Sequence, residues 1–145
     1  MYLVVEGEPQ GKARARTVRG KNGRVHSYTP QKTVDYEQEV KKAFYYADCY
    51  DDLWFNDEPL KATIIAYFGI PKSVSNKKKE QMDRDEIRPC KKPDADNIAK
   101  AILDGLNGLV YKDDKQIVEL VVKKHYSNSP CVEVIIEEAE TEYGH

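Results

Sequence analysis

The sequence is poor in the side chains that hold zinc or build disulfide frameworks. Its three cysteines, Cys49, Cys90 and Cys131, are an odd number without a C-x-x-C pair, and its three histidines are scattered. Structural zinc sites need closely spaced Cys and His ligands, and disulfide-stapled domains need an even, dense set of cysteines. The sequence therefore argues against both, and we expect a protein of a reducing compartment.

Long apolar runs are also absent. No stretch approaches the roughly 20 residues that span a bilayer, and the apolar start of the chain is too short for the core of a signal peptide. The 145 residues are 33% charged and 40% hydrophobic, and the mean hydropathy is -0.73, as in soluble globular proteins. We expect a single domain over residues 1–145, a cytoplasmic location and no membrane partner.

A third absence concerns negative charge. Residues 11–28 contain no Asp or Glu, although the net charge of the whole chain is -2. The basic side chains of this segment are Lys12, Arg14, Arg16, Arg19, Lys21 and Arg24. Like charges held together repel one another, so an anionic partner such as the DNA backbone would stabilise this exposed arm or wide hairpin. The alternative is a basic loop that is merely solvated.

Hydrophobic periodicity predicts an α+β fold with a mixed or mostly antiparallel sheet of about four strands and two main helices. In the order β-α-β-α-β-β, we expect strands at 2–6, 60–70, 116–126 and 131–137, and helices at 30–47 and from Asp94 to just before Gly108. The turn at 127–130 predicts that the last two strands pair as a hairpin. Residues 72–88 form a solvated loop, a short polar helix or a flap, and Trp54 is expected in the core.

Two pairs of aspartates flank the second predicted helix. Asp94 and Asp96 stand at its start, and Asp113 and Asp114 follow its end. Each pair has a structural alternative, because Asp caps helix N-termini and occurs in turns. If folding brings the pairs together, they offer the carboxylate oxygens that Mg²⁺ prefers and leave room for water and a phosphate oxygen. Such a site is suited to phosphodiester hydrolysis.

The polar face of the same helix adds a basic group to these acids. At about 100° per residue, Asp96, Lys100, Asp104 and Asn107 lie together, opposite the apolar residues. Lys100 follows Asp96 by one turn and has two interpretations. It either forms an intrahelical ion pair with Asp96 or contacts the phosphate that is cleaved.

The two motifs together, KPDADNIAKAILDGLNG from Lys92 and KDDKQIVE from Lys112, resemble the signature of the RusA-type Holliday-junction resolvases. The resemblance covers Lys91 to about Leu120, and the segment from Gly11 to Pro30 is more weakly similar to one branch of the family. Residues 72–88 form a longer insert than in compact members. Because of this insert, the resemblance does not define the path of the DNA over the protein.

The resemblance implies a homodimeric, Mg²⁺-dependent endodeoxyribonuclease, with Mn²⁺ as a substitute, that nicks two opposed strands of a four-way DNA junction in recombination and repair. The residues that match the family's functional positions are Asp94, Asp96 and Asp114 as catalytic metal ligands, Lys100 as the essential lysine, and Asn97 and Asp113 in support. Two alternatives remain beside this function. One is a junction-binding protein without catalysis, and the other is a nuclease acting on other branched DNA.

Overall fold

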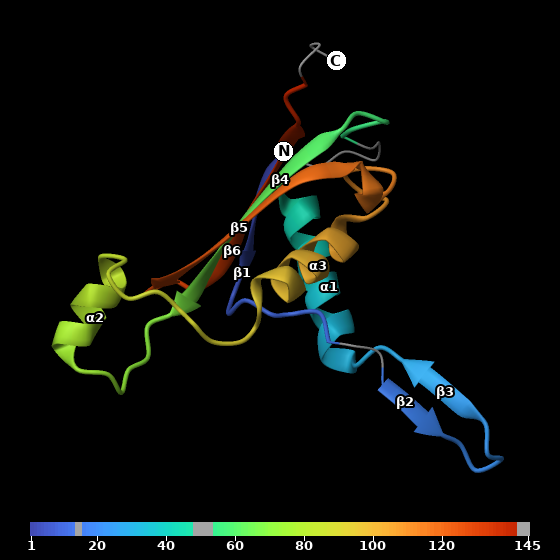
Figure 1. Cartoon of the computed structure of the whole chain (residues 1–145), viewed down its shortest axis with the longest axis horizontal. Coiled ribbons are helices and arrows are strands. Elements are labelled where there is room, and N and C mark those ends of the chain that lie inside the picture. The colour runs from blue at the N-terminus through green and yellow to red at the C-terminus, as the bar shows by residue number, and fades with distance from the viewer. Residues whose placement is uncertain (14–15, 48–53, 142–145) are drawn as a thin grey trace.

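The computed structural model describes residues 1–13, 16–47 and 54–141, without the side chain of Arg16. The elements are β1 (Tyr2–Glu6), β2 (Arg16–Arg19), β3 (Val25–Tyr28), α1 (Gln31–Tyr46), β4 (Leu60–Gly69), α2 (Asn76–Asp83), α3 (Ala95–Leu106), the 3-10 helix η1 (Asp114–Gln116), β5 (Ile117–Ser127) and β6 (Cys131–Glu138). The described residues form a four-stranded mixed sheet, a two-stranded hairpin and three α-helices (Figure 1). The predicted α+β class is confirmed.

β4 is the central strand around which the sheet is built. The strand order is β1-β6-β4-β5, and β4 is antiparallel to β6 and parallel to β5. Burial alternates strictly along β4, with Leu60, Ala62, Ile64, Ala66 and Phe68 buried and the residues between them half-buried. This is the period of a strand that has one face against a core. The strand predicted at 60–70 is thus confirmed and lies inside the sheet.

The predicted hairpin between the last two strands is wrong, because β4 lies between β5 and β6. A parallel pair such as β4 and β5 needs a long crossover, which α2 and α3 supply, and β6 then returns on the other side of β4. The turn between β5 and β6 crosses the end of β4, where Ile70 N donates to Ser127 O at 3.1 Å. β6 is thereby enclosed between two strands, and its Val132, Val134 and Ile136 are fully buried.

Helices α1 and α3 cover one face of the sheet and pack against each other (Figure 1). Both lie within about a residue of their predicted bounds, and α3 ends shortly before Gly108, whose φ of +80° suits a residue just past a helix. The two helices approach closely at Gly105, where a β-carbon would lie 2.9 Å from Val40 Cγ1. None of the helices in the described part of the chain is long and apolar enough to cross a membrane.

The segment 72–88 contains a polar helix, α2, and thus follows one of the alternatives to the solvated loop. It projects from the sheet in Figure 1 but is fastened to β5 at its C-terminal end. Asp85 Oδ1 lies 2.7 Å from His125 Nδ1, and Arg88 Nε donates to Lys124 O at 3.0 Å. Side-chain contacts to a strand therefore hold a segment that has little apolar surface of its own.

The basic segment forms the predicted hairpin, with β2 and β3 paired from Arg16 opposite Tyr28 to Arg19 opposite Val25. The expectation for Trp54 is wrong, since its side chain is 42% exposed. Large aromatic positions in the core are instead filled by Phe44 and Tyr111, both fully buried.

Gly105→Leu tests the close packing of α1 against α3. A leucine must push the helices apart, so we expect the free energy of unfolding to fall by about 1–3 kcal/mol, measured by urea denaturation. Gln38→Leu, at an exposed position on α1, is the control and should change this free energy by less than about 0.5 kcal/mol. Equal midpoints for the two variants would contradict the described packing.

Candidate functional site

Asp94 occupies the N-cap position of α3, but its side chain does not cap the helix. The backbone is extended there, with φ -68° and ψ 153°, while the carboxylate accepts no capping hydrogen bond. Asp94 and Asp96, in the first turn, are both exposed. Within the described parts of the chain, neither carboxylate has a hydrogen bond or ion-pair partner. The capping alternative is therefore not realised for Asp94, and both side chains remain available to a ligand.

α3 presents one polar stripe to solvent. Its buried residues are Ile98, Ala99, Ala101, Ile102, Leu103, Gly105 and Leu106. On the opposite side, Asp96, Lys100 and Asn107 are exposed and Asp104 is half-buried, as the periodicity predicted. Asp96 and Lys100, about 6 Å apart along the axis, form no ion pair, and Lys100 has no hydrogen bond or ion pair with any other described residue. The ammonium group of Lys100 is thus not neutralised by its helix.

Lys12 joins the N-terminal segment to both helices. Its Nζ lies 2.7 Å from Glu37 Oε1 and 2.9 Å from Asp104 Oδ2, and its backbone N donates to Asn97 O at 2.9 Å. Burial by itself lowers the pKa of Lys12, but the hydrogen bonds and charges of Glu37 and Asp104 outweigh it and raise the pKa. The positive charge that was predicted to contact DNA is therefore shared with two carboxylates of the fold.

The second acidic pair lies on η1, which is fixed by Gln116. In a capping box, Asp113 Oδ1 accepts from Lys115 N at 2.9 Å, and Gln116 Oε1 accepts from Asp113 N at 3.2 Å. Gln116 Nε2 also donates to Asn56 O at 2.9 Å. Gln116 was given no role from the sequence, although the spacing of a capping box, Asp followed three residues later by Gln, identifies it.

Tyr111 ties this acidic loop to α3. Its buried hydroxyl donates to Leu103 O at 2.7 Å, and Gly108 N donates to Tyr111 O at 2.9 Å. Burial raises the pKa of Tyr111, and the charges of Asp114 and Asp104 raise it further. The buried Tyr111 side chain thus contacts α3 at Leu103, and the charges of Asp104 and Asp114 act on its hydroxyl.

Asp114 experiences the charges of α3. Partial burial is the largest cause of its raised pKa, followed by a hydrogen bond to Asp113 and the charges of Asp113 and Asp104, while the charge of Lys100 lowers it. The pKa of Asp113 is lowered instead, chiefly by the hydrogen bond from Lys115 N. The charges of Lys100 and Asp104 on α3 therefore act on the ionisation of Asp114.

Asp94 and Asp96 are not gathered into one closed cluster with Asp114. Among residues 1–13, 16–47 and 54–141, no group of three or more His, Cys, Asp or Glu side chains is close enough to hold a metal ion. The first pair lies at the start of α3, and the second pair follows the end of α3 in the chain. Carboxylate oxygens are thus present on this surface, but among the described residues they do not surround a single metal position.

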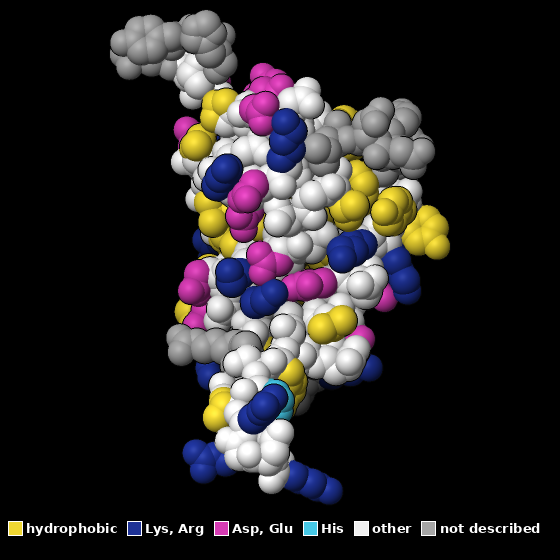
Figure 2. Space-filling model, turned by 90° about the vertical axis from the view of Figure 1, so that its right-hand side faces the viewer, with side chains coloured by type: hydrophobic (Ala, Val, Ile, Leu, Met, Phe, Trp, Pro, Cys, Tyr) yellow, Lys and Arg dark blue, Asp and Glu magenta, His cyan; other side chains and the backbone are white. Residues whose placement is uncertain are grey.

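The β2–β3 hairpin carries exposed basic side chains away from the body (Figure 2). Arg19, Lys21 and Arg24 are exposed, and the turn between the strands is closed by Gly20 N, which donates to Arg24 O at 2.7 Å. Arg14, predicted to act with them, lies outside the described residues. The hairpin offers charge and extended reach, which suit an anionic polymer better than a small ligand.

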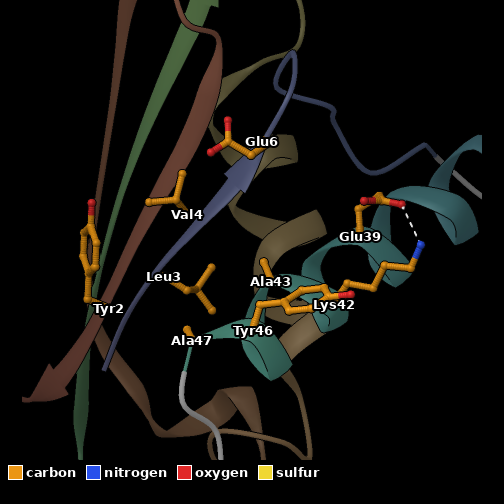
Figure 3. A pocket seen from close by; sticks show the side chains of 9 residues that line it. All are labelled: Tyr2, Leu3, Val4, Glu6, Glu39, Lys42, Ala43, Tyr46 and Ala47. Atoms are coloured by element: carbon orange, nitrogen blue, oxygen red, sulfur yellow. Dashed lines mark hydrogen bonds and ion pairs between the residues drawn. The ribbon is translucent and has the colours of Figure 1, made fainter.

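A hollow of about 470 Å³ between β1 and α1 is a poorer candidate (Figure 3). Of its charged lining residues, Lys42 and Glu39 pair with each other at 3.4 Å. Neither acidic pair nor Lys100 lines it. The chemistry predicted from the sequence therefore lies elsewhere, along α3.

A family model described as endodeoxyribonuclease RusA matches residues 6–137 of the chain. The chain belongs to the RusA endodeoxyribonuclease family. The match runs from the end of β1 into β6 and so extends far beyond Lys91 to Leu120, where the resemblance was strongest. Uncharacterized protein YqaN of Bacillus subtilis (strain 168) is a relative, 42% identical over 139 residues that make up 94% of each chain.

Removal of charges on α3 tests the position of Asp114 in this RusA-family chain. A positive charge favours an ionised carboxylate, so Lys100→Met should raise the pKa of Asp114 further, whereas Asp104→Asn should lower it. NMR titration of the carboxyl carbons in metal-free protein measures both shifts. Lys42→Met, on the far half of α1, is the control and should leave the titration of Asp114 unchanged. Shifts of the opposite sign would contradict this placement.

Proposed function

We propose that the protein is a Mg²⁺-dependent, structure-selective endodeoxyribonuclease that resolves four-way (Holliday) DNA junctions by paired symmetric nicks in recombination and repair. The observation that carries this proposal is membership of the RusA family over residues 6–137. The exposed aspartates at the start of α3 and the aspartates after its end support it, since these are the positions that match the family motif.

The donor chemistry of this surface fits Mg²⁺. The ion takes hard oxygen ligands and keeps several of its waters, so a site needs few carboxylates and an open side. We assign Asp94, Asp96 and Asp114, all exposed, as the residues that would hold it. When bound, the ion supplies an activated water and neutralises charge on the phosphate oxygens. Mn²⁺ prefers the same ligands and should substitute for it in assays.

The remaining motif residues bind the DNA phosphate or hold parts of the site in place. Lys100 is assigned to the scissile phosphate, because its unpaired ammonium can stabilise negative charge as it develops there. Asn97 and Asp113 act in support. Asn97 O holds Lys12 N at 2.9 Å against α3, and the Asp113 cap keeps η1 in place. These contacts would fix the catalytic groups before DNA arrives.

The basic hairpin is assigned to the DNA backbone. Contacts from Lys and Arg to phosphates fix the position of a duplex without reading its sequence, as an enzyme selective for structure requires. The group predicted from the sequence is Lys12, Arg14, Arg16, Arg19, Lys21 and Arg24. Lys12 and Arg14 precede the hairpin in the chain, and Lys12 is paired with Glu37 and Asp104. We also propose a homodimer, because paired nicks in opposed strands need two active sites related by a two-fold axis, as the strands of the junction are.

Asp96→Asn separates binding from cleavage. Loss of a group that only orients a metal ligand typically costs 10–100-fold, so loss of a ligand itself should lower Mg²⁺-dependent nicking by at least about 100-fold. Binding to the junction in EDTA should be retained. Glu39→Gln, remote from α3, is the control, and nicking by Asp96→Asn at the control rate would disprove the assignment.

The choice of substrate needs a direct comparison. Labelled four-way, three-way, flap and linear DNA should be incubated with Mg²⁺, with Mn²⁺ and with neither ion, and the cuts mapped. Symmetric cuts confined to the four-way junction are the expected result. The two alternatives, a junction-binding protein without catalysis and a nuclease on other branched DNA, give different results in this assay. Binding without cutting in either ion would establish the first alternative, and equal cutting of flaps would establish a broader nuclease.

The hairpin is tested by Arg19→Ala with Arg24→Ala. Each lost phosphate contact should reduce the slope of log affinity against log salt by about 0.9 for duplex DNA. Fluorescence anisotropy at several salt concentrations measures this slope. Lys41→Ala with Lys42→Ala removes the same number of charges from α1 and should leave the slope unchanged. Identical slopes for both double variants would rule out the hairpin as a contact.

A further inference from the structure

A cavity of about 600 Å³ lies beside Asp94 and has no role so far. It is bounded by the segment before the hairpin and by the starts of α1 and α3, which Figure 1 shows close to one another. Its lining includes three lysines, Lys12, Lys32 and Lys92, and one carboxylate, that of Asp94. Among these lysines, the sequence predicted a DNA-binding role for Lys12 alone.

Two of the three lysines carry a charge that the fold does not neutralise. Lys12 is paired with Glu37 and Asp104 at 2.7 and 2.9 Å. Lys32 and Lys92 are exposed, and neither has a hydrogen bond or ion-pair partner among the described residues. The lining of the cavity therefore includes two lysines without a partner in the described part of the chain and a single acidic residue.

The segment before the hairpin makes short contacts to side chains of both helix starts and so forms a wall of the cavity. A β-carbon on Gly11 would lie 2.8 Å from Pro93 Cβ and 3.2 Å from Asn97 Cβ, so this segment lies directly on the start of α3. On the other side, Ala13 N donates to the buried Thr33 Oγ1 at 3.1 Å. The segment thus bridges both helices, and the cavity is present before any ligand arrives.

We propose that this cavity is a subsite for a phosphodiester group of the nucleic-acid backbone, with Lys32 and Lys92 as its ligands. The inference rests on the proposed function and extends it to the strand that leads to Asp94. A lysine ammonium binds phosphate as a point charge, so it does not require the DNA strand to hold one fixed geometry. The positive ends of the α1 and α3 dipoles add to the attraction. The phosphate held here is a neighbour of the one that is cut, between the hairpin and the carboxylates.

The test measures binding without catalysis. Lys32→Ala and Lys92→Ala are titrated against labelled four-way junction in EDTA over a range of salt concentrations. Each variant should bind several-fold more weakly at low salt, with a salt slope smaller by about 0.9 on duplex DNA or about 0.7 on a single strand. Lys42→Ala, from the other end of α1, is the matched control. Slopes equal to that of the control in both variants would overturn the proposal.

Two further measurements keep the result specific to the cavity. Lys32→Arg and Lys92→Arg retain the charge and should retain the wild-type slope, whereas a fall in these variants would point to altered folding and overturn the assignment. Ethylation interference locates the phosphate. Ethylation of one backbone phosphate next to the nick site should weaken binding by wild type but not by Lys32→Ala, and equal interference in both proteins would count against the subsite.

Failure of this inference differs from failure of the proposed function. Reduced slopes in a protein that cuts no DNA with Mg²⁺ or Mn²⁺ would support the subsite and refute the nuclease. Specific cutting of junctions with unchanged slopes would support the nuclease and refute the subsite.

Discussion

The burial of α3 between the sheet and α1 is the constraint on which the candidate site depends. Its Ile98, Ile102 and Leu106 are 0% exposed, and burying each such side chain contributes about 1.5–3 kcal/mol relative to leaving it in water. The helix cannot turn about its axis without losing this contribution. The polar stripe therefore keeps its direction although Asp96 and Lys100 have no partners of their own among the described residues. Apolar packing orients groups that must stay free for a ligand.

Polar contacts hold the segments around α3 that apolar packing does not fix. Lys12 crosses from the N-terminal segment to Glu37 on α1 and Asp104 on α3, and the hydroxyl of Tyr111 fixes the acidic loop to Leu103 O. A half-buried ammonium without its carboxylates would be costly, so Lys12 holds the three segments together only while both partners remain. The same contacts that hold these segments together thus also decide which charges remain unpaired.

Local patterns were read correctly from the sequence, and long-range pairing was not. The periodicity of α3 placed Asp96 and Lys100 on its solvent side, and a run of apolar and aromatic residues gave β4, because both signals depend on neighbours in the chain. The prediction that β5 and β6 form a hairpin was wrong because no local pattern shows that β4 lies between them. Similarly, the cation run around Lys12 gave no sign that Glu37 would neutralise one member, because that contact joins residues 25 positions apart.

The two ends of the α3 stripe differ in their charged groups. At its start lie the lysines of the cavity and the positive end of the helix dipole, while Asp104, Asp113 and Asp114 gather near its end, where they raise the pKa of Tyr111. Asp94 and Asp96 also lie at the start, so the first end attracts a DNA strand through its lysines and a divalent cation through its carboxylates, whereas the second end attracts the cation alone. On the proposed function, each ligand then lowers the electrostatic cost of binding the other. Since such coupling is reciprocal, DNA should strengthen metal binding by the factor by which metal strengthens DNA binding.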